Sequence, residues 1–242
     1  MDISFLITTY NSGKFIKRCI DSCVNQEKHN LQIEIIIIND GSTDNTLKIL
    51  NKYNKLNICK IYHQNNSGIE KSINNAFKKA KGKFFIRVDA DDFLQPNYLN
   101  SIQKHLNNNE CFYYTNYNLV NVKEELIKEV LLPKFDKCEI LERGDFMATG
   151  TIFPRNLIKK YGCYQENIKN CGLENYDFIL RLLKRGVKGI LIPKTVVFYR
   201  RHNENMSVEK ISSIIKFGNE LAKKYNLGKY KTNRYHPYGL KI

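Results

Sequence analysis

Residues 3–88 alternate between short hydrophobic runs and longer stretches in which apolar side chains recur every three or four positions. The runs bounded by polar turns predict strands at residues 3–9, 33–38, 58–62 and 83–88. One helical stripe joins Phe15, Ile16, Cys19, Ile20, Cys23 and Val24, and a later one joins Ile69, Ile73, Ala76, Phe77 and Ala80. Strands that alternate with amphipathic helices are typical of a mostly parallel sheet with helices on both faces. We therefore expect an α/β fold.

The pattern in the remainder of the chain is less regular. Ser42 and Thr43 are expected to cap a helix that continues to about Tyr53. The elements expected beyond Pro96 are a helix over 98–106, a strand at 111–117, an apolar segment at 147–153, a helix over 176–183, short runs at 187–192 and 196–199, and a helix over 207–225. No element is predicted for residues 118–143. Without an internal repeat or low-complexity linker, we expect one domain at 1–205 and a basic C-terminal helical extension at 206–242.

The charge of the chain indicates which partners it attracts. Its 39 Lys and Arg residues outnumber 24 Asp and Glu, which gives a net charge of +15 at pH 7 and favours nucleotides, polyanionic acceptors or anionic lipid. Residues 210–242 contain eight Lys or Arg and one acid, so this tail is either a contact for an anionic membrane or a solvated helix face. No nucleic-acid-binding module is recognisable, and we expect no nucleic acid partner.

Targeting features and cysteines indicate a cytoplasmic protein, with peripheral contact at the inner face of the membrane left open. The N-terminus lacks the basic and long apolar regions of a secretory leader, and no apolar stretch reaches the length of about 18 residues that a spanning helix needs. The seven cysteines form no CxxC pair and are expected to be reduced thiols. Cys19 and Cys23 lie four positions apart without a second ligand pair, which favours buried packing over zinc binding.

Two acidic turns follow predicted strands, at residues 39–44 and 89–92. In open α/β sheets, ligands bind at the carboxyl ends of the strands, where both turns are expected. The first turn also has the composition of an ordinary tight turn, and the second that of a solvated loop. However, Asp89, Asp91 and Asp92 place three carboxylates within four residues, and their mutual repulsion is relieved by water or by a divalent cation. Mg²⁺ or Mn²⁺ completed by substrate phosphates suits such a turn.

Four segments, in order along the chain, resemble motifs of the family-2 glycosyltransferases. They read TTYN at 8–11, NDGSTD at 39–44, NNSG at 65–68 continuing through KGK at 81–83 into DAD at 89–91, and YRRH at 199–202 followed by Ser207. They are similar, respectively, to the opening strand and turn, the DDGSxD motif, the NxG-helix-AxGxY segment with its DxD motif, and the YRxHxxxxS segment. Four matches in order at family spacing are far more specific than any one of them.

The resemblance implies a GT-A-like fold, Rossmann-like with a mostly parallel central sheet, and an inverting transfer of a sugar from a nucleotide diphosphate to an acceptor hydroxyl. It implies a nucleotide-sugar-binding half at 1–117 and an acceptor-binding half at 118–205. Asp40 would hydrogen-bond the base, expected to be uracil, and Mn²⁺ or Mg²⁺ would be held by Asp89, Asp91 and His202. The residues expected to bind the donor are Thr9, Tyr10, Asn11, Asp40, Ser42, Asn66, Gly68, Lys71, Asp89, Ala90 and Arg200.

The chain departs from the family pattern at two places. An Arg-Asn pair is replaced by Ile73 and Asn74, so Lys71 is the expected substitute for one polar contact to the donor. More important, the acceptor hydroxyl needs a general base, and the aspartate that the family uses corresponds to Asn175. An amide cannot accept this proton, so either Glu174 or Asp177 takes the role, or the register of the motif is shifted, or the enzyme is impaired; we favour Glu174 or Asp177. Both acids also lie where they would favour the dipole of a helix without any catalytic role.

These observations predict a metal-dependent hexosyl- or N-acetylhexosaminyl-transferase acting on a glycan, lipid-linked or protein-linked acceptor, as in bacterial surface polysaccharide synthesis. A nucleotidyltransferase of similar fold would need a basic phosphate loop near the N-terminus, where only Lys14 is found. A non-catalytic nucleotide-sugar-binding protein is a second alternative, which Asn175 leaves open. The sequence does not determine the sugar, the acceptor or the oligomeric state.

Overall fold

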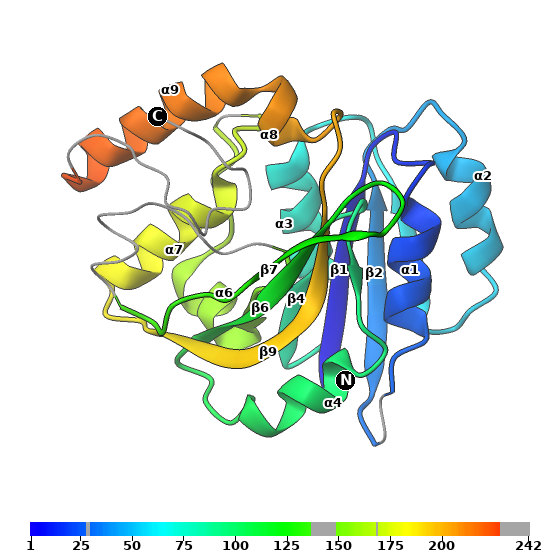
Figure 1. The fold of residues 1–242 in the computed structure, drawn as a ribbon, viewed down its shortest axis with the longest axis horizontal. Helices are drawn as coiled ribbons and strands as arrows, with labels where there is room; N and C mark the ends of the chain where they lie inside the picture. The colour runs from blue at the N-terminus through cyan, green and yellow to red at the C-terminus, as the bar shows by residue number, and fades with distance from the viewer. Residues whose placement is uncertain (28–29, 137–148, 168, 228–242) are drawn as a thin grey trace.

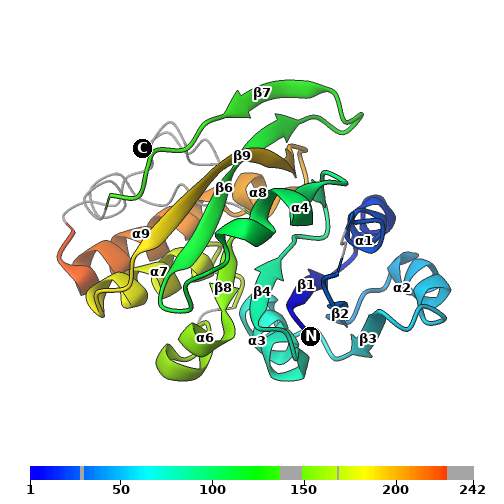
Figure 2. The same cartoon turned by 90° about the horizontal axis from the view of Figure 1, so that it is seen from below.

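The computed structural model describes residues 1–27, 30–136, 149–167 and 169–227, and within them nine strands form one sheet (Figures 1 and 2). The strands along the sheet are β3 (Cys59–His63), β2 (Ile33–Asn39), β1 (Ile3–Thr9), β4 (Phe84–Arg87), β8 (Ile152–Pro154), β6 (Phe112–Val120), β9 (Gly189–Arg200) and β5 (Phe93–Leu94), with β7 (Leu126–Val130) paired to β6.

The first four strands in chain order form the parallel part of the sheet. β1 pairs in parallel with β2 and β4, and β2 pairs in parallel with β3. Every residue of β2, IEIIIIN, is buried, as expected for a central strand covered on both faces. Beyond β4 the sheet is mixed, because β8 runs antiparallel to β4 while β6 and β9 are parallel to each other. The predicted α/β fold is confirmed.

Helices cover both faces of the sheet. They are α1 (Ile16–Val24), α2 (Thr46–Leu50), α3 (Ile69–Lys79), α4 (Tyr98–Ile102), α6 (Arg155–Tyr161), α7 (Glu174–Lys184), α8 (Met206–Glu209) and α9 (Ile211–Tyr225), with 3-10 turns at Asn51–Tyr53 and Gln103–His105. Figure 2 shows α3 on one side of β1 and β2, and α1 on the other. The apolar stripes predicted for α1 and α3 form their buried faces, and Cys19 and Cys23 are buried free thiols within α1.

Three details differ from the sequence-based expectations. Ser42 and Thr43 do not cap a helix; α2 begins at Thr46, whose N–H donates to Asp44 Oδ1 at 2.9 Å. The two runs at 187–192 and 196–199 form one strand, because the pairing of β9 with β6 passes over Pro193, which has no N–H to donate. The expected helix over 207–225 is interrupted at Lys210, between α8 and α9.

The segment for which no element was predicted is partly described. It contains the end of β6 and all of β7, whereas residues 137–148 lie outside the described residues. The boundary expected between the two halves, at residue 118, falls inside β6, so both halves share one sheet. The basic tail packs on the domain through Ile214, Leu221 and Ala222 of α9, and its remainder from residue 228 lies outside the described residues.

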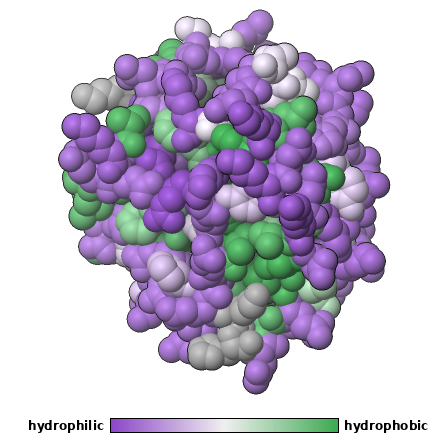
Figure 3. All heavy atoms as spheres, turned by 90° about the vertical axis from the view of Figure 1, so that its right-hand side faces the viewer, coloured by the Kyte–Doolittle hydropathy of each residue, from purple (hydrophilic) through white to green (hydrophobic). Residues whose placement is uncertain are grey.

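The surface is consistent with the high content of lysine. Figure 3 shows one face on which hydrophilic side chains predominate around a smaller hydrophobic area. Within the described part of the chain, no helix combines the length and the apolar character that crossing a membrane requires.

Candidate donor and catalytic site

The turns after β1 and β2 contact each other at one edge of the sheet. Thr9 and Asn39 are register partners at the ends of these strands, which brings the two turns side by side. Asn11, in the left-handed region at φ 50°, donates its N–H to Ser42 Oγ at 3.0 Å and accepts the N–H of Thr43 at 2.8 Å. From the family resemblance, both turns are expected beside the nucleotide. The hydrogen bonds between them show that each turn stabilises the conformation of the other.

The residues of the first turn differ in their availability to a ligand. Tyr10 is 51% exposed and can present its ring to a nucleobase at this edge. Thr9, in contrast, is 2% exposed, and its side chain belongs to the core. The contact expected between Thr9 and the donor stays a prediction; the Thr9 hydroxyl is buried and has no hydrogen-bond partner among the described residues.

Asp40 holds the loop at residues 64–68. Its Oδ1 accepts the N–H of Ser67 at 2.9 Å and Gln64 Nε2 at 2.7 Å, and its Oδ2 accepts the N–H of Gly68 at 2.9 Å. Asp40 is 4% exposed. The direct bond expected from Asp40 to the base stays a prediction, and in this structure the carboxylate accepts Gln64 Nε2 and two backbone N–H groups of its own chain. Its geometry supports shaping the loop, in which Gly68 adopts φ 93°.

The loop that Asp40 holds continues into α3. Asn66 is exposed, and its carbonyl oxygen accepts Lys169 Nζ at 3.0 Å. Lys71 is exposed on the first turn of α3, where it remains available to a donor phosphate. Ile73 is fully buried, so the position at which the family usually has arginine belongs to the core in this chain.

The turn at residues 89–92 meets the segment that follows β9. Asp91 Oδ2 lies 3.0 Å from His202 Nε2 and accepts Asn205 Nδ2 at 3.0 Å, although His202 lies 111 positions further along the chain. The His202 ring packs on Phe15 with 4.7 Å between centroids, which fixes its orientation. The side chains of Asp89 and Asp91 are 27% and 28% exposed, so both retain access to a ligand. Ala90, between them, is buried.

Asp92 differs from its two neighbours. It is 1% exposed, and its Oδ1 accepts the N–H of Arg200 at 2.8 Å. Burial, together with the charges of Asp91 and Asp89, raises the pKa of the Asp92 carboxyl well above its usual value. The structure thus separates one buried acid from the two partly exposed acids of this turn.

The surroundings of Arg200, which is expected to bind the donor, are mainly those of a buried structural cation. Arg200 is 2% exposed, and its guanidinium donates to the carbonyl oxygen of Asp91 at 2.8 Å and to Glu124 Oε1 at 2.9 Å. Its Cζ also lies 5.1 Å from the ring centroids of both Phe15 and Phe93. Because these contacts surround the cation, Arg200 supports the backbone of the acidic turn instead of facing a diphosphate.

The chemistry of Asp91 and His202 fits a divalent cation. Asp91 Oδ2 and His202 Nε2 lie 3.0 Å apart and offer an oxygen and a nitrogen ligand, which Mn²⁺ and Mg²⁺ accept, but the ligand atoms of Asp89, Asp91 and His202 do not all lie within 4.8 Å of one another. The expected grouping of Asp91 with His202 is therefore present, whereas Asp89 also accepts Arg87 Nε at 2.7 Å.

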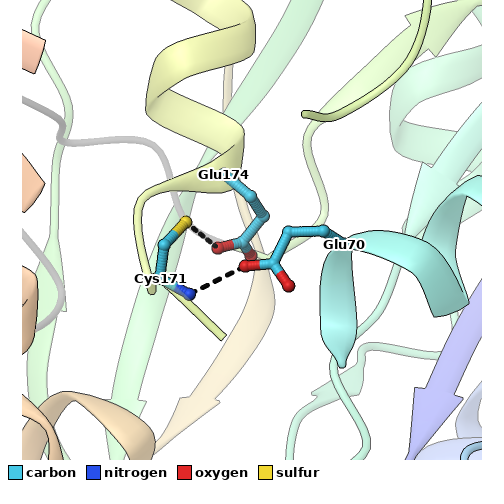
Figure 4. Close-up of side chains that lie close together, drawn as sticks. All are labelled: Glu70, Cys171 and Glu174. Carbon is cyan, nitrogen blue, oxygen red and sulfur yellow. Dashed lines mark hydrogen bonds between the residues drawn. The ribbon is translucent and has the colours of Figure 1, made fainter. Parts of the chain in front are cut away.

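Among the described residues, one group of three potential metal ligands has its ligand atoms within 4.8 Å of one another: Glu70, Cys171 and Glu174. Figure 4 shows these side chains pointing toward one another. Glu70 already accepts the N–H groups of Asn170 at 2.8 Å and Cys171 at 2.7 Å, and burial raises the pKa of the Cys171 thiol far above its usual value. These contacts identify a carboxylate that anchors the start of α7, and not a metal centre.

Glu174, at the start of α7, is connected to the acidic turn by Arg87. Arg87 Nη1 donates to Glu174 Oε1 at 2.7 Å, and Nε of the same guanidinium donates to Asp89. Burial raises the pKa of Glu174, an effect that Arg87 opposes and the charge of Glu70 increases. Arg87 was not among the expected site residues; its sequence signal is a charged residue in a buried strand directly before the acidic turn.

The other two candidates on α7 have different surroundings. Asp177 accepts Lys224 Nζ and Tyr225 OH at 3.1 Å and Arg181 Nε at 3.2 Å, so its carboxylate joins α7 to α9. A role for Asp177 as general base is therefore not supported. Asn175 Oδ1 accepts the hydroxyl of Tyr164 at 3.0 Å, which orients the amide.

The chain has the GT-A fold that solved glycosyltransferases share. It matches residues 1–349 of S. aureus TarS in complex with UDP-GlcNAc with a TM-score of 0.73 and 21% identity, covering 95% of this chain and 67% of that chain. It also matches the mannosyltransferase PcManGT from Pyrobaculum calidifontis, in complex with GDP-Man and Mn²⁺, with a TM-score of 0.69 and 16% identity over 94% and 65% of the two chains.

The family follows from the sequence. The model of glycosyl transferase family 2 matches residues 4–162, and the chain belongs to this family. It is 32% identical over 216 residues to a hyaluronan synthase of Pasteurella multocida, covering 86% of this chain and 21% of that protein. It is 30% identical over 241 residues to a chondroitin synthase of Escherichia coli, covering 95% and 34%. The chain thus spans about a fifth to a third of the length of these two relatives.

Proposed function

We propose that this glycosyltransferase is an inverting, metal-dependent enzyme that transfers a hexose or N-acetylhexosamine from a UDP-sugar to an acceptor hydroxyl. The observation that carries the proposal is the pairing of Asp91 with His202 across 111 positions, at the carboxyl edge of the parallel strands. The TarS complex with UDP-GlcNAc supports this donor class, and the complex of PcManGT with Mn²⁺ supports the metal.

The chain's own residues divide the work of the reaction. Tyr10 stacks on the base, the loop shaped by Asp40 encloses the nucleotide, and Lys71 reaches a donor phosphate. Asp91 and His202, with Asp89 as a further ligand, would hold a divalent cation, which would supply charge stabilisation to the leaving diphosphate. Glu174 accepts the proton of the attacking hydroxyl. Its Oε1 accepts Arg87 Nη1, whereas its Oε2 has the weaker thiol contact of Cys171 at 4.0 Å, and the side chain is 4% exposed, so the proposal requires the acceptor hydroxyl to reach a nearly buried carboxylate.

The acceptor is proposed from the named relatives and from charge. Hyaluronan and chondroitin synthases support a glycan acceptor, lipid-linked or protein-linked, in bacterial surface polysaccharide synthesis. The net charge of +15 favours an acidic glycan or peripheral contact with an anionic membrane, reached from the cytoplasm through the basic tail. In this proposal residues 118–205 bind the acceptor and residues 1–117 the donor.

The test is the release of nucleotide diphosphate from UDP-GlcNAc, UDP-glucose, UDP-glucuronic acid and GDP-mannose, with acidic and neutral oligosaccharide acceptors and Mn²⁺. We expect turnover with one UDP-sugar and an inverted anomeric configuration in the product by NMR. Glu174→Gln should lower kcat by about 10²–10⁴-fold, whereas Asp177→Asn should leave it unchanged. Retention of configuration, or equal turnover in Glu174→Gln, would contradict the mechanism.

Asn175 favours one second candidate, a nucleotide-sugar-binding protein without transferase activity. An amide at this position cannot accept a proton, and it is already bonded to Tyr164. If the chain binds a nucleotide sugar without turnover, and Asn175→Asp gains turnover, the binding function is supported. Turnover by the wild-type chain that depends on Glu174 excludes it.

A further inference from the structure

Arg87 occupies an unusual position for a charged side chain. It ends β4, whose other residues Phe84, Phe85 and Ile86 are buried, and its own side chain is 11% exposed. A buried guanidinium requires anionic partners. Arg87 has two, each at 2.7 Å, because Nε binds Asp89 and Nη1 binds Glu174. The guanidinium of Arg87 thus joins the acidic turn after β4 to the first residue of α7.

The groups around Glu174 make this contact consequential. Glu70 approaches from α3, Cys171 from the turn before α7, Tyr164 from the segment after α6, and Arg87 from β4. Of these four, Arg87 alone carries a positive charge. Without it, Glu174 would be a buried carboxylate beside a second carboxylate, where the neutral acid is favoured over the anion.

We propose that Arg87 is a positioning residue that keeps Glu174 ionised and fixes the distance between the carboxylates of Glu174 and Asp89. The inference rests on the proposed role of Glu174 as the general base. Two separate N–H donors of the planar guanidinium hold the two carboxylates, and a lysine cannot reproduce this geometry although it keeps the positive charge. Because the charge remains, Arg87→Lys should restore part of the activity that Arg87→Gln loses.

The first experiment follows kcat and KM against pH in Arg87→Gln, Arg87→Lys and a matched control, Arg155→Gln. The Arg155 guanidinium donates to the backbone carbonyl of Lys81 at 3.1 Å. In Arg87→Gln we expect the acidic limb of the kcat profile to move to higher pH and kcat at pH 7 to fall by about 10²-fold or more. The KM for the donor should change much less. Arg87→Lys should lie between this variant and the wild type, and the control should match the wild type.

A second measurement does not depend on turnover. ¹³C-carboxyl-labelled glutamate identifies Glu174 by the NMR signal lost in Glu174→Gln, and its titration is compared in wild type, Arg87→Lys and Arg87→Gln. A midpoint that rises in the order wild type, Lys, Gln supports the inference even if the chain proves to lack transferase activity. An unchanged midpoint overturns it, as does a loss of activity in Arg87→Gln that appears only in KM. Should Arg87→Gln fail to fold, the Arg87→Lys titration decides.

Discussion

Replacing Asp177 by asparagine separates structural from catalytic carboxylates on α7. The Asp177 side chain is 3% exposed and accepts three donors, of which Arg181 is 20% exposed and Lys224 54% exposed. An amide keeps one acceptor oxygen but turns an NH₂ group toward cationic donors. Disrupting a buried ion pair costs about 3–5 kcal/mol, and the exposure of Lys224 places this variant at the lower end. We therefore expect a loss of about 3 kcal/mol in the free energy of unfolding.

Urea unfolding, followed by circular dichroism, measures this loss. The control is Glu220→Gln, an exposed change on the same α9 helix, which should alter stability by less than about 0.5 kcal/mol. Nucleotide release per folded molecule should be the same in Asp177→Asn and wild type. The assignment is refuted if Asp177→Asn keeps full stability but loses turnover as severely as Glu174→Gln, because Asp177 would then be the base.

Three further changes test other parts of the account. Asp40→Asn cannot accept the N–H groups of both Ser67 and Gly68, so urea unfolding should show a loss of about 1–3 kcal/mol, and nucleotide affinity should fall with it. Burial would raise the pKa of Glu34, but Lys60, the N–H of Lys81 and Ser4 lower it below the ordinary 4.5. The stability that Glu34 contributes is therefore present above pH 4.5 and declines as the pH falls through its folded pKa, so Glu34→Gln should flatten this acid dependence in urea unfolding. Gly82→Ala would place Cβ 2.6 Å from the backbone nitrogen of Ser4, and its thermal unfolding should show a loss of about 1–3 kcal/mol.

The elements with regular periodicity were the ones that sequence alone predicted well. Runs such as IEIIIIN are too apolar for any position except a central strand, and the acidic turns therefore had to lie at strand ends. The meeting of Asp91 with His202 was expected only through the family resemblance, because no local pattern connects positions so far apart. β7 was missed because it is a short strand with mostly exposed residues, which leaves little alternation to detect.

The sequence does not reveal the direction of the charged side chains at the site. The sequence shows that Arg200 is a cation, but its burial follows from the packing of Phe15 and Phe93 around it. Glu174 and Asp177 lie within one turn of the same helix, and their surroundings differ because Glu174 meets Arg87 of β4 whereas Asp177 meets α9. Arg87 was missed because its partner Glu174 is 87 positions away. Such contacts are properties of the assembled fold.

Thermal unfolding with UDP, GDP, CDP and dTDP, each with and without Mn²⁺, tests most directly whether Asp91 and His202 form a metal-assisted donor site. A ligand that binds the folded state alone stabilises it by about 2.7 kcal/mol at 100 times its dissociation constant. We predict a rise in Tm for UDP that requires Mn²⁺ and disappears in Asp91→Asn. No rise with any of the four nucleotides, or an equal rise in Asp91→Asn, would contradict the account.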